Sequence, residues 1–437
     1  MNRPVPCPVG QYVPHLLGLW RARFSSGVPV DPRGSRLLPD GRLTGPELYE
    51  AAAAVKELSR GFTRERGLAG TPYMDDPGLL GGYLLFYWTV SFAQTWAALL
   101  SAGLLPGKHL EGRRVLDLGA GPGPSSLALL AAGAGRVTAV DRSAPALEIA
   151  VELARRSGRR LETRVADLAS GARLPEGPFD LVTAVHTVNE LWSDRDDRLD
   201  RRRAFVERLA GLLTPGGRVL LVDPALTATA NEAIELRDAL VAGGWRVLAP
   251  CAREEGCPAL PSGTCHADVA WDPPPAVRRI GHAARIGRES LAFSYFLLES
   301  GGSVPHHRAA APPKGAETPA EERPDGSPPA LYRVVSDRFL AKSGRLRVLL
   351  CGPEGRFPLS VDGRASFPSA GTFRSLSRHD LVRVGGVEQR ATGWGLTPTS
   401  VLEVVARAPS MEDPRARQDR RTQSAPRRRP SPRRRPR

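Results

Sequence analysis

Residues 114–126 read RVLDLGAGPGPSS, a short apolar strand that runs into three glycines and then into the start of a helix. Glycine lets the backbone turn sharply and lets a ligand approach it closely. The glycines are Gly119, Gly121 and Gly123, and the acid Asp117 stands two residues before the first of them. The stretch therefore predicts a nucleotide-type ligand site at the carboxyl end of a strand.

The acids around this loop indicate which ligand it takes. A dinucleotide fingerprint has a third glycine at position 124, where this chain has proline, and does not favour an acid beside a pyrophosphate. An acid at Asp117 instead suits a ligand with a cationic amino acid end, such as S-adenosylmethionine (SAM). Asp141, which ends RVTAVD, is placed to accept both ribose hydroxyls, and Asp167 in RVADL to meet the adenine amino group. We expect this site to bind SAM. The alternatives are a site that binds NAD and a degenerate site that binds no ligand.

Strands alternate with helices around the glycine loop. Five apolar runs, each ending near a polar residue or a turn, lie at 113–119, 136–141, 161–167, 179–186 and 217–223. Helical spacing recurs between them, and this alternation predicts a parallel, doubly wound α/β sheet. Two later strands, at 245–250 and 290–300, suit the seven-stranded sheet of a class I SAM-dependent methyltransferase. We expect that Rossmann-like domain to occupy residues 111–300.

The flanking regions differ in character. Residues 1–110 are predicted to be helical, with Thr44 as an N-cap and Glu47 three residues later. Residues 330–408 contain alternating apolar strands and predict a small β-rich module. Between these parts, 301–329 is rich in Pro, Ala and Gly and predicts a disordered linker, and 409–437 predicts a disordered Arg/Pro tail.

The charge and the apolar pattern of the chain indicate which partners and which cell compartment to expect. The formal net charge is +15, and the tail contributes eleven arginines against three acids, so attraction to polyanions is expected. A GC-rich genome is the alternative cause of the arginine bias. No apolar run is long enough for a transmembrane helix, and the start has no secretory h-region. We expect a cytoplasmic protein that does not bind membranes.

Candidate catalytic residues follow the fourth strand, in AVHTVNELW. Methyltransferases place substrate-facing residues at this position, so His186, Asn189 and Glu190 are candidates to touch a substrate or orient the sulfonium. Capping of the next helix is an equal alternative for Asn189 and Glu190. The chain has no Asn-Pro-Pro-Tyr motif for methylation of exocyclic amines, and no cysteine placed for chemistry at pyrimidine C5.

Four of the five cysteines form one pattern. Cys251, Cys257 and Cys265 have five and seven residues between them, and Cys351 follows after 85 more. Four thiolates are what zinc or an iron–sulfur cluster requires. Zinc knuckles usually show tighter Cys-x2-4-Cys pairs, and the long gaps fit a 4Fe–4S cube better. Zinc and unligated buried thiols remain the alternatives, and His266 is a further candidate ligand.

The chain resembles the mitochondrial small-ribosomal-subunit methyltransferase-like assembly-factor family and its bacterial relatives, over about residues 40–405. The resemblance rests on the order of SRGFTRERG, DLGAGPG, TVNEL, the three-cysteine loop and LLCGPEG. Two departures stand out. Ala267 replaces the usual aromatic after the third Cys-His, and arginines replace the usual lysine in the segment that follows it.

This resemblance implies a class I methyltransferase fold and a 4Fe–4S cluster on Cys251, Cys257, Cys265 and Cys351. It also implies a role in maturing the small ribosomal subunit through binding to its rRNA, by a protein that we expect to be monomeric when free. Two alternatives stand beside this expectation. One is an ordinary SAM-dependent methyltransferase with a structural zinc, and the other is a non-catalytic rRNA-binding assembly chaperone that has lost methyl transfer.

Overall fold

A computed structural model describes residues 5–25, 43–64, 66–105, 107–260, 263–287, 289–301, 330–408 and 410–411. The predicted linker and Arg/Pro tail lie outside the described residues, apart from Gly301, Ser410 and Met411. None of the described helices is both long and apolar enough to cross a membrane.

The N-terminal region is helical, as predicted. Thr44 begins a helix with a complete capping box: its hydroxyl accepts from the Glu47 N–H (3.4 Å), and its own N–H donates to the Glu47 carboxylate (2.7 Å). The elements are η1 (Pro8–Tyr12), α1 (Val13–Arg23), α2 (Gly45–Ser59), η2 (Arg60–Arg64), η3 (Tyr73–Asp75), α3 (Pro77–Gly82), η4 (Tyr83–Tyr87) and α4 (Trp88–Ser101). Two of them, η2 and η4, are single π-helical turns.

The central sheet has the strand order β3-β2-β1-β4-β5-β8-β6, and β7 pairs with β8. The first five strands run parallel, and β8 runs antiparallel to β5. The strands are β1 (Arg114–Leu118), β2 (Arg136–Asp141), β3 (Glu162–Val165), β4 (Phe179–Val185), β5 (Leu213–Pro224), β6 (Arg246–Ala249), β7 (Ala267–Ala270) and β8 (Ser290–Glu299). This is the class I methyltransferase sheet that the sequence predicted, with β7 as an additional short strand.

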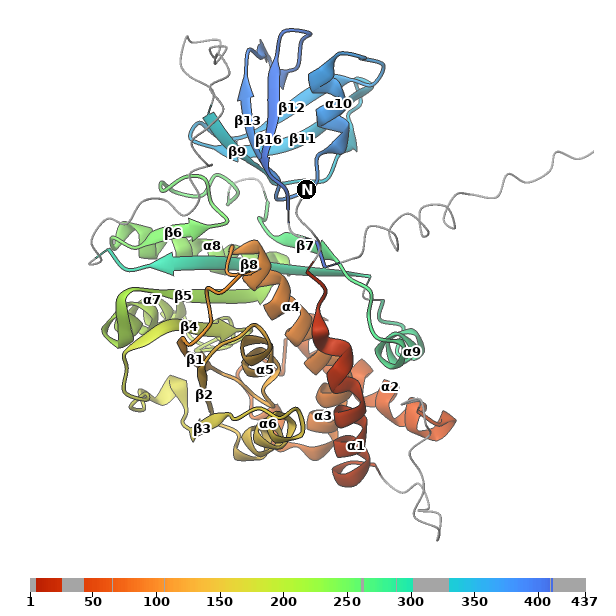
Figure 1. Cartoon of the computed structure of the whole chain (residues 1–437), viewed down its shortest axis with the longest axis vertical. Helices are drawn as coiled ribbons and strands as arrows, with labels where there is room; N and C mark the ends of the chain where they lie inside the picture. The colour runs from red at the N-terminus through yellow and green to blue at the C-terminus, as the bar shows by residue number, and fades with distance from the viewer. Residues whose placement is uncertain are drawn as a thin grey trace, which may run out of the picture.

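Helices cover both faces of this sheet (Figure 1). Central strands such as β1 and β4 are buried on both sides, which explains their continuous apolar runs. One hydrophobic cluster joins the N-terminal helices to α5 and α6, and a second lies under α7 and α8. Apolar residues surround α4, so it is a fully enclosed helix. The helices here are α5 (Pro124–Ala131), α6 (Ala144–Arg156), η5 (Leu168–Ser170), α7 (Arg198–Leu209), η6 (Ala210–Leu212), α8 (Thr227–Ala242) and α9 (Pro275–Ala283).

The C-terminal module has its own core and its own sheet, of order β14-β15-β12-β11-β9-β13-β16, with β10 paired to β11. Figure 1 shows it beside the β6–β8 end of the central sheet. After the module the chain returns to the main domain, where Met411 is buried and the Val5 N–H donates to the Ser410 carbonyl (3.2 Å). Its elements are β9 (Ala330–Val334), β10 (Phe339–Leu340), β11 (Arg345–Gly352), β12 (Gly355–Asp362), α10 (Pro368–Ser375), β13 (Leu381–Gly385), β14 (Glu388–Arg390), β15 (Gly393–Gly395) and β16 (Val401–Ala406).

Candidate functional site

The glycine loop joins β1 to α5 in a conformation that only glycine adopts easily. Gly119, Gly121 and Gly123 have φ values of 68°, 52° and 81°, in the left-handed region. A Cβ at Gly119 would lie only 2.2 Å from the Thr187 hydroxyl, which itself donates to the Leu118 carbonyl (2.9 Å). The loop is therefore shaped by its backbone and by close contact with the segment after β4.

We expect Gly119→Ala to destabilise the fold more than Gly103→Ala. Both glycines have left-handed φ, but nothing lies within 4 Å of a Cβ at Gly103. The shared backbone strain costs about 1–2 kcal/mol, and the clash with Thr187 adds about 1–3 kcal/mol. Urea unfolding of the two variants measures the difference, and equal losses would show that the Thr187 contact is relieved without cost.

Asp117, the acid before the glycine loop, lies at the end of β1 and is buried. Its carboxylate is fully buried below the loop and accepts hydrogen bonds from Ser125, Ser126 and Thr183 (2.5, 2.6 and 2.7 Å). Burial raises its pKa. It is not among the residues that line the pocket, and its three hydrogen bonds fasten the start of α5 to β1 and β4. Contact of Asp117 with the amino acid end of a ligand stays a prediction.

The other two predicted acids, Asp141 and Asp167, do line the pocket beside the loop. Asp141 accepts from the N–H groups of Gly121 (2.7 Å) and Ser143 (2.8 Å), and its burial raises its pKa. Asp167 is exposed and accepts from the Ala169 N–H (2.9 Å). Asp141 is the last residue of β2 and Asp167 follows the end of β3, so both stand at the carboxyl edge of the sheet, where such sheets bind ligands.

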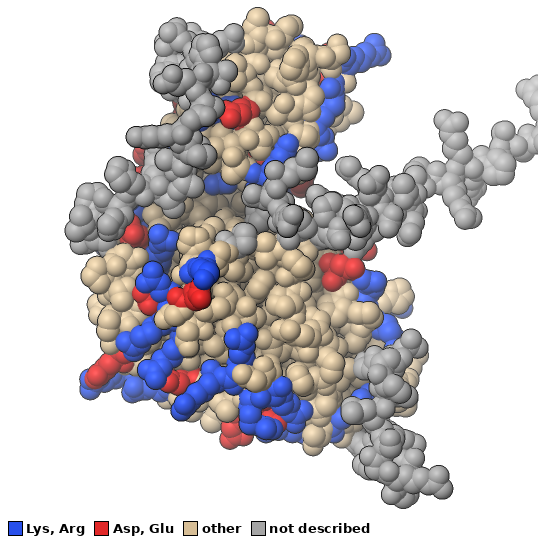
Figure 2. Space-filling view, viewed as in Figure 1, with Lys and Arg blue, Asp and Glu red and all other residues tan. Residues whose placement is uncertain are grey.

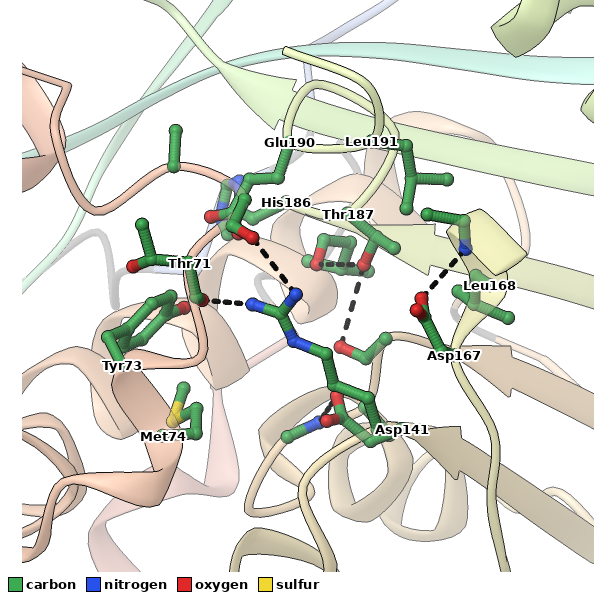
Figure 3. A pocket seen from close by; sticks show the side chains of 18 of the residues that line it. Thr71, Tyr73, Met74, Asp141, Asp167, Leu168, His186, Thr187, Glu190 and Leu191 are labelled. Atoms are coloured by element: carbon green, nitrogen blue, oxygen red, sulfur yellow. Dashed lines mark hydrogen bonds between the residues drawn. The ribbon is translucent and has the colours of Figure 1, made fainter. Parts of the chain in front are cut away.

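The pocket has a volume of about 420 Å³ and opens at the carboxyl ends of β1, β2 and β4. Figure 3 shows Tyr73 and Met74 on one side and Asp167 and Leu168 on the opposite side. The segment before α3 therefore forms a wall of this pocket, facing the sheet. Ser125 and Pro124 at the start of α5 also belong to the lining.

Comparisons with known proteins agree with this geometry. A family model described as a methyltransferase domain matches residues 115–217. Release factor glutamine methyltransferase of Deinococcus radiodurans is 34% identical over 252 residues, which cover 53% of this chain and 81% of that protein. The chain belongs to the SAM-dependent methyltransferase family.

Other relatives match shorter stretches. Ribosomal protein L11 methyltransferase of Azotobacter vinelandii is 32% identical over 152 residues, 35% of this chain and 46% of that protein. Cypemycin N-terminal methyltransferase of a Streptomyces species is 37% identical over 120 residues, 27% and 45% of the two chains. This chain thus spans less than half the length of these two proteins, and the matches bear on the methyltransferase domain alone.

Solved structures match at low identity. Mitomycin 7-O-methyltransferase is 19% identical, with 58% of this chain and 68% of that chain covered and a TM-score of 0.34. The ribosomal protein L11 methylase of Lactobacillus delbrueckii is 16% identical, with 48% and 79% covered and a TM-score of 0.30. The fold assignment rests on the strand order and the family match, not on these superpositions.

Two of the three candidate catalytic residues of this methyltransferase line the pocket. They are His186 and Glu190, which follow β4, while Asn189 lies behind them and is buried. When the side-chain amide of Asn189 is oriented with its nitrogen toward the neighbouring acceptors, that nitrogen donates to Asp223 Oδ1 (2.9 Å) and to the His186 carbonyl (3.2 Å). Asn189 therefore supports the segment after β4, and the structure does not place it where it would touch a substrate.

Glu190 lines the pocket, and its carboxyl group has a raised pKa. Burial raises the pKa of Glu190 to about 7. A hydrogen bond from the Gly70 N–H and the positive charge of Arg142 both lower this pKa, but their effect is smaller than that of burial. Arg142 donates to the carbonyls of Gly70 (2.9 Å) and Thr71, so it ties the loop before α3 to the end of β2. The bond to Thr71 is drawn in Figure 3.

We expect Glu190→Gln to stabilise the fold at pH 8 and to have little effect at pH 5. The folded pKa lies above the ordinary value, so the folded state binds the proton more tightly than the unfolded chain. That stabilisation is complete below about pH 4.3 and is lost as the pH rises through 7. Glutamine cannot ionise, so the variant escapes this loss. Its free energy of unfolding at pH 8, measured with urea, should exceed that of the unaltered protein by on the order of 1–3 kcal/mol.

Glu148→Gln on the exposed surface of α6 is the matched control. It should show no comparable difference between the two pH values. A gain of the same size for both variants would assign the effect to overall charge and not to the pocket.

Several lining residues were missed from the sequence. Tyr83 is placed in the pocket by the π-helical turn η4, where its hydroxyl lies 3.2 Å from Ser91 Oγ. Such π-helical turns are frequent at functional sites, but no residue pattern in the sequence predicts them. Tyr73 and Met74 come from the short helix η3, for which the only available signal was the turn-rich GTPYMDD segment. Arg142 comes from the loop after β2.

The four predicted cysteines meet at the boundary between the methyltransferase domain and the β-rich module. Three lie in the loop between β6 and β7, and Cys351 lies on β11. Burial is the largest cause of the raised pKa of each thiol, and it raises the pKa of Cys251 to about 11 and that of Cys265 to about 12. The charges of Cys251, Cys257 and Cys351 each raise the pKa of Cys265 further. The set is therefore one electrostatic unit, although 85 residues separate its last two members.

Guanidinium groups surround these thiols. Arg237 lowers the pKa of Cys251, Arg253 lowers that of Cys351, and Arg356 lowers that of Cys265. The buried Nε atoms of Arg253 and Arg356 have no hydrogen-bond partner. Buried donors of this kind favour an anionic group among them.

Within the described ranges, no three His, Cys, Asp or Glu side chains are grouped tightly enough to hold a single metal ion. His266 is engaged elsewhere: its Nδ1 lies 3.4 Å from Thr264 Oγ1 and its Nε2 lies 3.3 Å from Arg378 Nη1. Cys7 packs with the N-terminal helices, in a different hydrophobic cluster from the cysteine loop.

Proposed function

We propose that this methyltransferase carries a 4Fe–4S cluster on Cys251, Cys257, Cys265 and Cys351 and acts on the rRNA of the small ribosomal subunit during its maturation. The observation that carries the proposal is the meeting of four thiols from two parts of the chain, in a site with unpartnered guanidinium donors. We further propose that the protein is cytoplasmic and monomeric when free.

The site suits a cluster better than a zinc ion. Four thiolates around a tetrahedral zinc lie close together, whereas the cysteines of a 4Fe–4S cube stand further apart at its corners. The described thiols influence one another without forming a single-ion site. A thiolate-bound cluster is anionic, which matches Arg237, Arg253 and Arg356. When bound, the cluster would supply a covalent link between loop and module and a one-electron redox centre.

Hydrogen bonds hold the backbone of the first part of the cysteine loop. Arg237 donates to the carbonyls of Arg253 (2.8 Å) and Glu255 (2.6 Å), and the Cys257 N–H donates to the Asp238 carboxylate (2.9 Å). From the module, Arg333 donates to the Pro250 carbonyl (3.0 Å). These contacts fix the backbone at residues 250–257, which carry Cys251 and Cys257.

Support for an RNA substrate comes from the surface charge. Figure 2 shows Lys and Arg side chains gathered in the part of the view where α6, β3 and α7 lie. Basic surfaces bind phosphate backbones without reading sequence. Exposed arginines of these elements and the segment joining α6 to β3 are Arg155, Arg159, Arg160, Arg164, Arg201 and Arg208.

A protein substrate from the translation machinery is the second candidate. Two of the relatives are named for a release factor and for ribosomal protein L11. The segment after β4 here reads HTVNEL, without the Asn-Pro-Pro-Tyr motif that methylation of exocyclic amines would favour. The segment after β4 therefore does not decide between the two substrates, and the cysteine set and the basic surface make us prefer the rRNA proposal.

Label transfer from tritiated SAM tests the substrate. Small subunits isolated from cells that lack this protein would be incubated with it, and rRNA and protein then separated. Label in the rRNA supports the proposal, and label in a ribosomal protein or release factor supports the second candidate. Co-sedimentation with the subunit but no label would indicate a non-catalytic chaperone. Mature small subunits and large subunits are the controls.

A further inference from the structure

The β-rich module is a barrel with the connectivity of an OB-fold. Strands β9, β11 and β12 form an antiparallel meander, and β13, which follows α10, pairs antiparallel with β9. The last segment closes the sheet, because β15 pairs parallel with β12 and the next strand, β16, pairs antiparallel with β13. OB-folds bind oligonucleotides and oligosaccharides on the outer face of their second and third strands, between two loops. In this module those strands are β11 and β12, and the two loops carry β10 and the β14–β15 hairpin.

The side chains that fill the barrel show which residues of β11 and β12 point outward. Val348, Leu350 and Leu359 are fully buried in the core of the module. Successive side chains of a strand alternate between its two faces, so the neighbours of these three residues lie on the outer face. We call this outer surface the β11–β12 face, and its residues are Arg345, Arg347, Leu349, Cys351, Arg356, Pro358, Ser360 and Asp362.

One end of the β11–β12 face meets the cysteine loop, and the other end is open. At the first end, Arg356 donates to the Thr264 carbonyl of that loop (3.4 Å). At the other end, Phe339 of β10 is 42% exposed and is paired in register with Arg347, which is paired in turn with Ser360. Directly paired residues lie on the same side of a sheet. An exposed aromatic ring, a guanidinium group and a hydroxyl therefore lie side by side across three strands.

Two arginines reach over β12 from opposite directions. Arg347 Nη2 donates to Thr392 Oγ1 in the β14–β15 turn (3.2 Å), and Arg390 Nη1 on β14 donates to Ser360 Oγ (3.0 Å). Gly395 makes room for the second arginine, because a Cβ at that position would overlap the Arg390 guanidinium. Glycine in a strand often marks such a close approach. The open end of the face is therefore covered by guanidinium groups held in place by hydrogen bonds.

The charge of this open end is positive. Glu388 accepts two hydrogen bonds from Arg390 (2.7 and 3.0 Å), so that pair has no net charge. Within the described part of the chain, no ion pair involves the four cations of β11 and the β10 loop, which are Arg338, Lys342, Arg345 and Arg347. The acids of the same loop and of the two strands are Asp337, which accepts from Arg378 (3.1 Å), and Asp362. Unpaired cations beside an exposed ring favour a nucleic acid over a neutral oligosaccharide.

We propose that the open end of the β11–β12 face binds single-stranded RNA, with a base stacked on the Phe339 ring and phosphates held by Arg347 and the cations beside it. Single strands present unpaired bases to aromatic rings, and their phosphates attract guanidinium groups whatever the sequence. The same contacts suit single-stranded DNA, so the choice of RNA rests on the proposed function. This site would hold the RNA, and the pocket at the glycine loop would hold SAM.

Fluorescence anisotropy with labelled U12, an RNA that forms no duplex, measures this binding on the full chain purified anaerobically. Phe339→Ala should weaken binding about 5- to 150-fold, the size of a lost base–aromatic stack, whereas Phe339→Trp should retain it. Arg347→Gln should lower the slope of log affinity against log salt by about 0.7, as expected for one phosphate contact on a single strand.

Tyr49→Ala and Arg383→Gln are the matched controls, and both should bind U12 as the unaltered protein does. Tyr49 is an aromatic residue of α2 that is 77% exposed, and Arg383 lies on β13, outside the β11–β12 face, where it pairs with Glu403. Unchanged U12 binding in both Phe339→Ala and Arg347→Gln would overturn the proposal. Tighter binding of dU12, which lacks only the 2′-hydroxyl groups, or of a 12-base-pair RNA duplex would also overturn it.

The site and the proposed function can fail separately. Weakened U12 binding in Phe339→Ala, together with no label in rRNA after incubation with tritiated SAM, would count against the proposed function and leave the single-strand site standing. Label in rRNA, together with unchanged U12 binding in the Phe339 and Arg347 variants, would overturn the site and leave the proposed function standing.

Discussion

Replacement of Cys351 with serine is expected to abolish iron binding and to undock the β-rich module. The module is joined to the cysteine loop by hydrogen bonds from Arg333 to Pro250 (3.0 Å), from Arg356 to Thr264 (3.4 Å) and from His379 to the His266 carbonyl (3.1 Å). Across the same boundary Arg253 donates to the Gly352 carbonyl (3.5 Å) and Arg378 donates to the His266 carbonyl (3.4 Å), and a cluster would add a covalent link to these bonds. Loss of about 1.4 kcal/mol of docking free energy would raise the undocked population about tenfold.

Limited proteolysis of anaerobically purified protein measures this effect. Cleavage in the module, at 330–408, should become about tenfold faster or more in Cys351→Ser and in Cys257→Ser. Cys7→Ser is the control, because Cys7 packs among the N-terminal helices and should change neither iron content nor cleavage. If Cys351→Ser kept both its iron and its resistance to proteolysis, Cys351 would not be a ligand.

The second large effect is expected for SAM binding in Asp141→Ala. The Asp141 carboxylate lines the pocket at the carboxyl end of β2, and a ribose hydroxyl bound to it would form charge-assisted hydrogen bonds. Such bonds contribute about 1.5–3 kcal/mol, so the dissociation constant should rise about 10- to 150-fold. Isothermal titration calorimetry with SAM and with S-adenosylhomocysteine measures the change.

Asp141 also accepts from the N–H groups of Gly121 and Ser143, so a loss of affinity could arise from the loop itself. Asp141→Asn separates the two causes, because it keeps an acceptor oxygen and removes the charge. Asp167→Ala, at the exposed rim, should weaken binding less than Asp141→Ala. Unchanged affinity in Asp141→Ala would refute the ribose assignment.

Much of the fold could be predicted because its signals are local. The capping box at Thr44 and Glu47 involves residues three apart, and the alternation of strands and helices follows from apolar periodicity. The glycine loop was also readable, because left-handed φ values at Gly119, Gly121 and Gly123 require that residue type. Each of these features depends on neighbours along the chain.

The features that sequence reasoning missed depend on distant partners. Three hydroxyls donate to the Asp117 carboxylate, and one of them belongs to Thr183, 66 positions away. Gln94 Oε1 lies 2.8 Å from His186 Nε2, 92 positions along the chain, and no periodicity connects a buried glutamine to a histidine after β4. Arg142 acquires its role only because the loop at Gly70 folds over the pocket.

The proposed 4Fe–4S cluster on Cys251, Cys257, Cys265 and Cys351 would link the methyltransferase domain to its β-rich module. Metal and acid-labile sulfide analysis of anaerobically purified protein tests it most directly. We predict a brown protein with about four iron and four sulfide per chain. One equivalent of zinc, with no iron and no absorbance beyond the ultraviolet, would contradict the claim.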